Sequence, residues 1–187
     1  MSGEMTANRG PATLETPRLL LRPFTLDDAE PFLRMNSEPE IIRYTYQEAL
    51  SSLEAAVELM HRSPLKDYAT WGFGRLAVVL KETGEVIGFC GLKYLPEIGE
   101  TEVGYRLMPE HWQQGLATEA AARVVEHGKD DLGLQRIVAL VDPGNAASAR
   151  VAEKIGLRLE GQIPFPGIDT PLDLYAWEAG GETTAIG

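Results

Sequence analysis

A glycine-containing turn between a strand and a helix holds the residues whose spacing points most directly to chemistry. Residues 103–109, Val-Gly-Tyr-Arg-Leu-Met-Pro, have the pattern of a strand, and an alanine-rich helix follows Gly115. Such a turn leaves backbone N–H groups unpaired at the start of the helix, where the helix dipole is positive. Both features suit a phosphate or diphosphate, so the turn predicts a phosphorylated ligand.

Strand-like and helix-like segments surround this turn. About seven strands are expected, at residues 18–24, 71–80, 86–92, 101–108, 136–141, 157–163 and 172–177. Four helices are expected at 25–36, 51–62, 115–130 and 145–156, the second with Leu53, Val57 and Met60 on one apolar face. This order indicates an α/β (α+β) fold in which a mixed sheet has helices on both faces.

The length and composition suit one globular domain. The chain has 187 residues, of which 44% are apolar, enough for a sizeable core. We expect a single domain over residues 14–178, a disordered N-terminal segment at 1–13 and a flexible tail at 179–187. Both ends are rich in small and polar residues, which favours poor order.

Charge and cysteine content narrow the classes of function. The formal net charge of −11 disfavours binding to nucleic acid or to an anionic membrane surface. It fits a cationic substrate such as an amine or a basic peptide, and it equally fits a role in solubility alone. No apolar run is long enough to span a bilayer, and the N-terminal residues lack the core of a signal peptide. With Cys90 as its single cysteine the chain forms no internal disulfide, so we expect a cytoplasmic protein.

Metal and thiol chemistry are not predicted. His61, His111 and His127 lack the spacing of metal ligands, so no metal site is expected. Cys90 stands among apolar residues in a strand, which favours a buried structural thiol. The turn also lacks the Gly-Lys-Ser/Thr ending of a phosphate-binding loop of ATPases, and Gly115 stands alone instead of in a dinucleotide-binding pattern.

Four motifs occur in a characteristic order. They are the start Leu14–Pro23, the Gly115 turn after a Val-Gly-Tyr strand, the segment Asn145–Ser148, and the segment Glu153–Leu157. Together they resemble the GNAT acyltransferase superfamily, and more narrowly its branch with the ribosomal-protein-alanine N-acetyltransferases (RimJ/RimL-like). Gly115 and Ala117 fit the turn pattern of that family, whereas Trp112 replaces its usual first residue, Gln or Arg.

The resemblance implies acetyl-CoA as the acyl donor and a primary amine as the acceptor, which attacks directly in a ternary complex. It implies a mostly antiparallel sheet whose central strands splay apart, so that the pantetheine arm of the cofactor pairs with an exposed strand. A backbone N–H of that strand would stabilise the oxyanion. The cofactor-binding residues implied in this way are Val103, Tyr105, Leu107, Gln113, Gln114, Gly115, Leu116, Ala117, Thr118, Asn145 and Ser148.

Acetyl transfer to an amine requires a base for the ammonium proton and an acid for the departing thiolate. Glu102 is the candidate base, because this branch has a glutamate before the same Gly-Tyr; the alternative is a solvated carboxylate beside Glu97 and Glu100. Ser148 is the candidate acid, and the alternative is a neutral helix residue. Tyr175 in the last strand is a reserve acid, and the alternative is a core aromatic.

The acceptor stays open between a small amine and a peptide or protein N-terminus, and the acyl chain length stays open too. We expect the acceptor site to be lined by Tyr44, Tyr46 and the helix from Ser52, with the loop at 164–169 as its other wall. The resemblance is compatible with a homodimer. A competing hypothesis is a non-catalytic acyl-CoA-binding sensor of the same fold.

Overall fold

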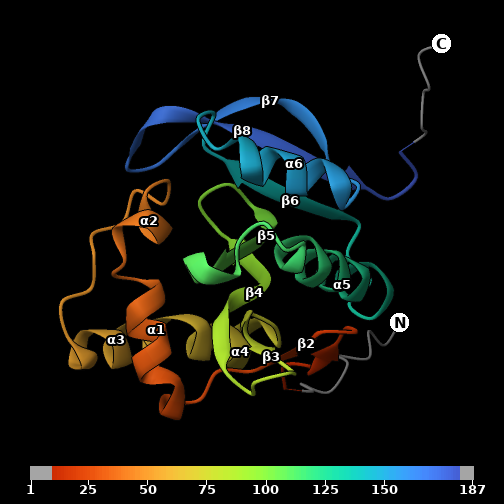
Figure 1. The fold of residues 1–187 in the computed structure, drawn as a ribbon. Coiled ribbons are helices and arrows are strands. Elements are labelled where there is room, and N and C mark those ends of the chain that lie inside the picture. Colours follow the sequence, from red (N-terminus) through yellow and green to blue (C-terminus); the bar gives the residue numbers. More distant parts are fainter. Residues whose placement is uncertain (1–9, 182–187) are drawn as a thin grey trace.

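A single mixed sheet forms the frame of the protein (Figure 1). The computed structural model describes residues 10–181, so most of the two expected flexible ends, 1–13 and 179–187, lies outside the described residues. In this range the strand order is β1-β2-β3-β4-β5-β6-β8-β7, and only β5 and β6 are parallel neighbours. The strands are β1 Leu14–Glu15, β2 Leu19–Arg22, β3 Arg75–Leu80, β4 Val86–Leu95, β5 Glu100–Leu107, β6 Arg136–Val141, β7 Arg158–Phe165 and β8 Ile168–Glu178.

Two of the helices begin at a residue whose side chain caps them. In the described part the helices are α1 Ala29–Met35, α2 Pro39–Ile42, α3 Leu53–Met60, α4 Lys66–Trp71, α5 Leu116–Asp130 and α6 Ala146–Lys154. Ser52 caps α3, because its Oγ accepts the N–H of Ala55 at 3.1 Å. Asn145 caps α6 in the same way, as its Oδ1 accepts the N–H of Ser148 at 3.2 Å.

Helices cover both faces of the sheet, as the sequence predicts, with α1 and α3 apart from α5 and α6 (Figure 1). On one face, Leu107 of β5 and Val124 of α5 belong to the larger core cluster. On the other, Phe89 of β4 packs with Phe32 of α1 and Met60 of α3 in a second cluster. The alternation of side chains along each strand therefore sends successive residues into two different environments.

The sheet is weakest between its two parallel neighbours. The register of β5 and β6 has a single pair, Glu102 opposite Val138, whereas β4 and β5 pair along their whole lengths. Beyond Glu102 the two strands part, so within residues 10–181 no strand pairs with the edge of β5 that faces β6 from Val103 to Leu107, whereas β4 pairs with its other edge. The predicted fold class, with its splayed central pair, is confirmed.

Several details of the expected elements are wrong. Strand β1 and helices α2 and α4 were not expected, and the expected loop at 164–169 is mostly a hairpin, because β7 runs to Phe165 and β8 begins at Ile168. Residues 71–74 are not strand, because α4 runs to Trp71 and Gly72 ends it in the left-handed conformation at φ 76°. Leu53 does not share a buried face with Met60: it is 42% exposed, and Ala56 takes the buried position. An alanine is too common on helix surfaces to mark the core face in a sequence, whereas in the structure its small size lets α3 pack closely against α1.

Candidate active site

The turn before α5 has the geometry of an anion site. Gln113 and Gly115 have left-handed backbones, at φ 59° and 77°, and these reverse the chain after β5. The first hydrogen bond of α5 joins the N–H of Glu119 to the carbonyl of Gly115 at 3.0 Å. Within residues 10–181, the N–H groups of the four residues from Gly115 to Thr118 donate to no protein acceptor. They are therefore available to a ligand, at the positive end of a 15-residue helix.

Trp112, which departs from the family pattern of the turn, contacts the end of β5. Its Nε1 donates to the carbonyl of Leu107 at 2.8 Å, which ties the turn to the end of β5. The indole is otherwise exposed. Because the unpaired donors are backbone groups, the identity of the first side chain leaves them unchanged.

Ser148 lies in a short chain of hydrogen bonds. Its Oγ is 3.0 Å from the hydroxyl of Tyr105 on β5 and accepts the Nδ2–H of Asn145 at 3.1 Å. Burial raises the pKa of Tyr105, and the hydrogen bond with Ser148 lowers it in part. When Tyr105 donates to Ser148, both lone pairs of that serine are used, and its own hydroxyl hydrogen is free to donate elsewhere. Tyr105 was expected to contact the cofactor, and its side-chain contact with Ser148 was not predicted from the sequence.

Glu102 lies on the opposite face of β5 and is largely buried. Its side chain is 14% exposed and its Oε1 accepts from Nη2 of Arg75 at 2.6 Å. Burial raises the pKa of Glu102, while Arg75, the Leu140 backbone on β6 and Lys93 act to lower it. The alternative of a solvated strand-end carboxylate does not describe this environment.

Gly104 makes room for the Arg75–Glu102 pair. A Cβ atom at Gly104 would lie 2.8 Å from Nη2 of Arg75 and 3.4 Å from Oε1 of Glu102. Arg75 reaches Glu102 by crossing β4 at Gly91, which is paired with both Arg75 and Gly104. Two glycines in register thus let one side chain span three strands.

A second arginine stands on the same face. Arg75 and Arg106 lie over the ring of Phe89, with guanidinium carbons 4.9 and 5.2 Å from its centre. Arg106 donates to Oδ1 of Asn36 at 2.6 Å and to Oε1 of Gln47 at 2.8 Å. Burial lowers the pKa of Arg106 to about 10, which leaves it charged at neutral pH.

The sequence offered only a partial sign of these arginines. Alternation along β5 puts Glu102, Gly104 and Arg106 on one face, as their spacing of two predicts. The contribution of Arg75 depends on the registers of β3, β4 and β5, which the chain does not reveal locally.

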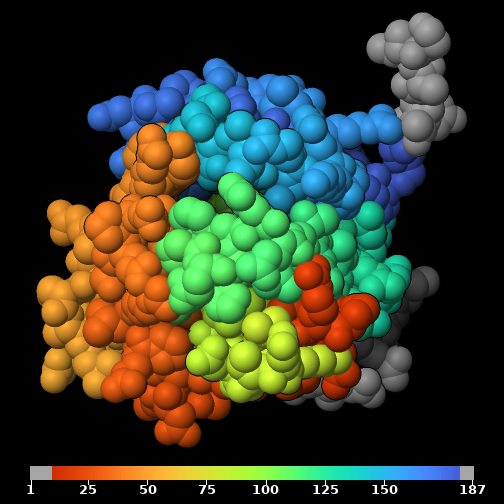
Figure 2. Space-filling model, viewed as in Figure 1, coloured from red at the N-terminus to blue at the C-terminus, as the bar shows by residue number. Residues whose placement is uncertain are grey.

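The candidate acid and base do not touch. Val103, Tyr105 and Leu107 face α5 and α6, whereas Glu102 faces α1 and α3. They flank the place where β5 and β6 separate, and Figure 2 shows a narrow hollow between the green surface in the middle of the view and the blue surface above it. Reactants approaching from the two faces would meet in this opening.

Tyr175, the reserve acid, is a buried residue of β8. It is 4% exposed, is paired with Ala139 of β6, and belongs to the larger core cluster. Burial raises its pKa. In the part of the chain that the structure describes, its hydroxyl makes no hydrogen bond with Ser148 or Glu102.

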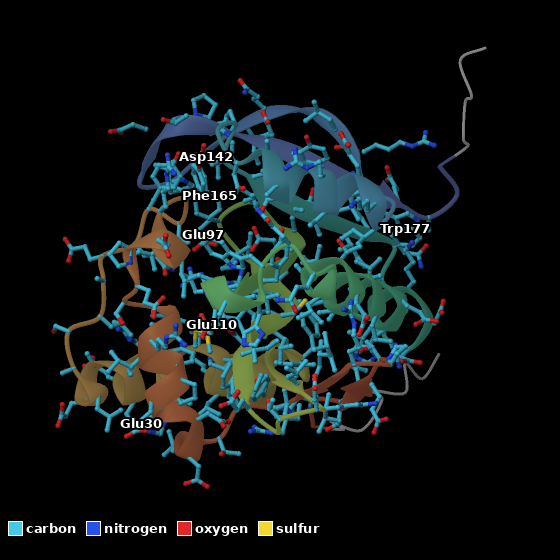
Figure 3. The ribbon with its side chains drawn as sticks, in the orientation of Figure 1. Glu30, Glu97, Glu110, Asp142, Phe165 and Trp177 are labelled. Atoms are coloured by element: carbon cyan, nitrogen blue, oxygen red, sulfur yellow. The ribbon has the colours of Figure 1, made fainter. Side chains whose placement is uncertain are left out.

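The expected acceptor-lining residues join the two halves of the sheet. Tyr46, with a left-handed backbone at φ 56°, hydrogen-bonds through its hydroxyl to the carboxylate of Asp142, just after β6. Tyr44 approaches Gly144 in the next turn, with a ring carbon 3.5 Å from where a Cβ of that glycine would be. Asp142 and Phe165 lie at the end of the second half of the sheet, on the side of α2 (Figure 3). This segment therefore bridges one end of the opening.

The described residues show no reactive thiol, no metal-binding cluster and no membrane-spanning helix. Cys90 is fully buried, and burial raises its pKa to about 12, so its thiolate is not available near neutral pH. Between residues 10 and 181, no three His, Cys, Asp or Glu side chains are grouped so as to hold a metal ion. No helix in that range combines the length and apolar character needed to cross a membrane.

The unpaired amides before α5 and the parted strands define a class of protein, the acyltransferases that receive a cofactor between two splayed strands. The sequence model of the Acetyltransferase (GNAT) domain matches residues 18–158. The chain therefore belongs to the GNAT acetyltransferase family, and it is an acyl-CoA-dependent acetyltransferase by family.

Three similar proteins illustrate this membership. The uncharacterized N-acetyltransferase YoaA of Bacillus subtilis strain 168 is 37% identical over 155 residues, which cover 80% of this chain and 85% of YoaA. The crystal structure of an acetyltransferase from Agrobacterium tumefaciens strain C58 has a TM-score of 0.77 at 30% identity, covering 89% of this chain and 94% of that one. Spermidine N-acetyltransferase from Vibrio cholerae, solved with CoA and spermine, has a TM-score of 0.71 at 21% identity and covers 87% and 96%; this likeness concerns the fold alone.

Proposed function

We propose that the protein transfers an acetyl group from acetyl-CoA to a primary amine by direct attack in a ternary complex. The observation that carries the proposal is the alignment of two features along one strand. The unpaired amides of the turn follow the C-terminal end of β5, and the free edge of β5 begins at Val103. A cofactor with a diphosphate in the turn has its extended arm beside that edge.

The cofactor site consists largely of backbone groups. The N–H groups of Gly115, Leu116, Ala117 and Thr118 receive the diphosphate, together with the turn at Gln113 and Gln114. The pantetheine arm pairs with the free edge of β5 at Val103, Tyr105 and Leu107, as an added strand would. Asn145 and Ser148 at the start of α6 contact the arm from the other half of the sheet.

The acceptor ammonium must lose two protons, and the sulfur must gain one. The ammonium loses the first proton to Glu102 through a water molecule, and the neutral amine attacks the thioester carbon. A new C–N bond forms, a backbone N–H of β5 stabilises the oxyanion, and the C–S bond then breaks. The thiolate takes a proton from Ser148, which regains one from Tyr105. The nitrogen gives its second proton through solvent to Tyr105, and Glu102 releases the first proton to solvent.

The positive charge beside Glu102 helps to keep the acceptor neutral. Arg106 is bound by the neutral side chains of Asn36 and Gln47, and among the described residues it forms no ion pair. A cation near the acceptor lowers the pKa of an ammonium by like-charge repulsion. The acceptor proposed on these grounds is a small amine or the α-amino group of a peptide, bound under the bridge made by Tyr46 and Asp142.

Release of free thiol from acetyl-CoA tests the proposal. The purified protein is incubated with acetyl-CoA and a panel of polyamines, aryl amines and N-terminal peptides, and products are identified by mass spectrometry. At least one acceptor should raise thiol release well above the rate of hydrolysis. Normal CoA binding without turnover on any acceptor would support the competing hypothesis of a non-catalytic acyl-CoA sensor.

A further inference from the structure

An arginine of the first hairpin, which is far away in the sequence, contacts the turn before α5. Nη1 of Arg18 donates to the carbonyl of Gln114 at 2.9 Å, and its Nε donates to Oε1 of Glu119 at 2.9 Å. The other carboxylate oxygen of Glu119 accepts from the backbone N–H of Arg18 at 3.1 Å and from the hydroxyl of Thr16 at 2.6 Å. The hairpin of β1 and β2 is thus fastened to the first turn of α5.

The contact with Gln114 fixes the direction of one peptide group. The carbonyl of Gln114 and the N–H of Gly115 belong to the same planar trans peptide, so they point in opposite directions. Because Arg18 holds the carbonyl on its own side, the N–H of Gly115 points away from Arg18, and it is the first of the unpaired donors. Gly115 is free to adopt other backbone angles, so without this contact the peptide could rotate and present its oxygen to the ligand.

The contact with Glu119 reduces the repulsion between this carboxylate and a bound diphosphate. A carboxylate in the first turn of a helix suits the helix dipole, but it repels a diphosphate bound at the same end. Both oxygens of Glu119 are occupied by Thr16 and Arg18, so its charge is neutralised and held on the hairpin side.

We propose that Arg18 is a positioning residue for the diphosphate of the acyl-CoA, because it fixes the Gln114–Gly115 peptide with its N–H toward the ligand and neutralises Glu119. The inference rests on the proposed function, since it needs acyl-CoA in the turn. The planar fork of arginine suits this site, because its Nε and Nη1 bind two acceptors from two fixed points of one rigid group, whereas a lysine offers a single nitrogen on a flexible stem.

A purely structural role for Arg18 predicts something different. The pair with Glu119 is partly exposed, with 46% and 19% of the two side chains accessible, and such pairs add little to folding stability. If Arg18 merely held the hairpin, its loss would affect all substrates alike. If it orients the turn, its loss matters only for substrates that carry a diphosphate.

The test compares two acyl donors, one with the diphosphate and one without it. Wild type, Arg18→Lys and Arg18→Gln are assayed with acetyl-CoA and with acetyl-pantetheine, which ends before the diphosphate, and CoA affinity is measured by calorimetry. We expect both variants to raise KM for acetyl-CoA and Kd for CoA about tenfold, the scale of one charge-assisted hydrogen bond, with kcat unchanged. Their kcat/KM for acetyl-pantetheine should equal that of the wild type.

Lys81→Gln is the matched control. Nζ of Lys81 binds Glu15 at 3.2 Å and the carbonyl of Thr16 at 2.7 Å, so it holds the same hairpin without touching the turn. This variant should behave as wild type with both donors. The proposal is overturned if Arg18→Lys keeps wild-type affinity for CoA, or if the Arg18 variants weaken both donors equally. A wild type that binds CoA but never turns over would refute the catalytic function, and the calorimetric comparison would still decide the role of Arg18.

Discussion

Replacing Glu102 with glutamine removes the candidate base and keeps the contact that holds it. The Oε1 atom of glutamine can still accept from Nη2 of Arg75, which is 2.6 Å away in the wild type. Removing the whole side chain would instead leave Arg75 largely buried without its partner, so loss of activity would be confused with loss of stability. Glu102→Gln therefore removes the base and its charge while a partner for Arg75 remains.

We expect kcat to fall about 100-fold, near the lower end of the roughly 10²–10⁴-fold range for general base catalysis. We expect the lower end because the proposed transfer runs through a water molecule, so that bulk water can replace part of the function of Glu102 in the variant. This loss corresponds to about 2.7 kcal/mol in the activation free energy. The Kd for CoA should not change, since the turn before α5 lies on the other side of β5.

The pH profile gives an independent readout. The base works in its ionised form, so activity falls as the pH drops through the pKa of Glu102, which burial raises above its usual value of 4.5. The acid limb of the wild-type profile should therefore begin above the ordinary carboxyl range. In Glu102→Gln this limb should vanish, leaving only the titration of the acceptor amine.

Steady-state rates measured by thiol release between pH 5 and 9, together with calorimetric CoA titrations, provide the assay. Glu100→Gln is the control, because Glu100 lies on the same strand and pairs with Arg136 at 3.0 Å in a similarly half-buried setting. It should retain wild-type rates. If Glu102→Gln kept the wild-type kcat and the same acid limb, Glu102 could not be the base.

Three further outcomes are expected. Ser148→Ala should lower kcat with acetyl-CoA about 10-fold to 100-fold, on the scale of lost acid catalysis, and much less with an acetyl thioester of an acidic aryl thiol, whose thiolate leaves without protonation; equal losses with both donors would exclude an acid role. Gly104→Ala puts a Cβ 2.8 Å from the end of the flexible Arg75 side chain, which must move away, so the variant should lose activity with little change in the free energy of unfolding; thiol release and urea denaturation measure the two, and wild-type activity would contradict the packing argument. Leu116→Ala truncates a side chain that is 2% exposed and should cost about 2–5 kcal/mol, read in the same titration, and a loss below that range would mean that the start of α5 is loosely packed.

The elements around the site could be predicted from the sequence because their signals are local. The caps Ser52 and Asn145, the left-handed Gly115 and the alternation along residues 100–107 all act within a few residues. Each sets a backbone conformation or the face of a strand without help from distant parts. The fold class follows from the order of such elements, and the family resemblance added the splayed pair of strands.

The contacts that complete the site are long-range and could not be predicted in this way. Arg75 and Glu102 are 27 residues apart, Tyr105 and Ser148 are 43 apart, and Arg18 and Glu119 are 101 apart. Each pair depends on strand register or on how a helix docks, and a shift of one residue would send the side chain to the opposite face. A sequence pattern can name such residues as candidates, but it does not specify their partners.

The alternation of side chains along β5 also suggests how the amine and the thioester could approach from opposite faces of the sheet. Glu102 faces the side of α1 and α3, whereas Tyr105 reaches Ser148 on the side of α6. An acceptor amine entering from the first side meets a base, and a thiolate leaving on the second side meets an acid. Because Glu102 and Tyr105 are three positions apart on one strand, both proposed proton transfers would occur near the single pair that joins β5 and β6 in residues 10–181. A rigid strand can hold the two groups in place, so the proposed direct transfer would require no rearrangement of the sheet.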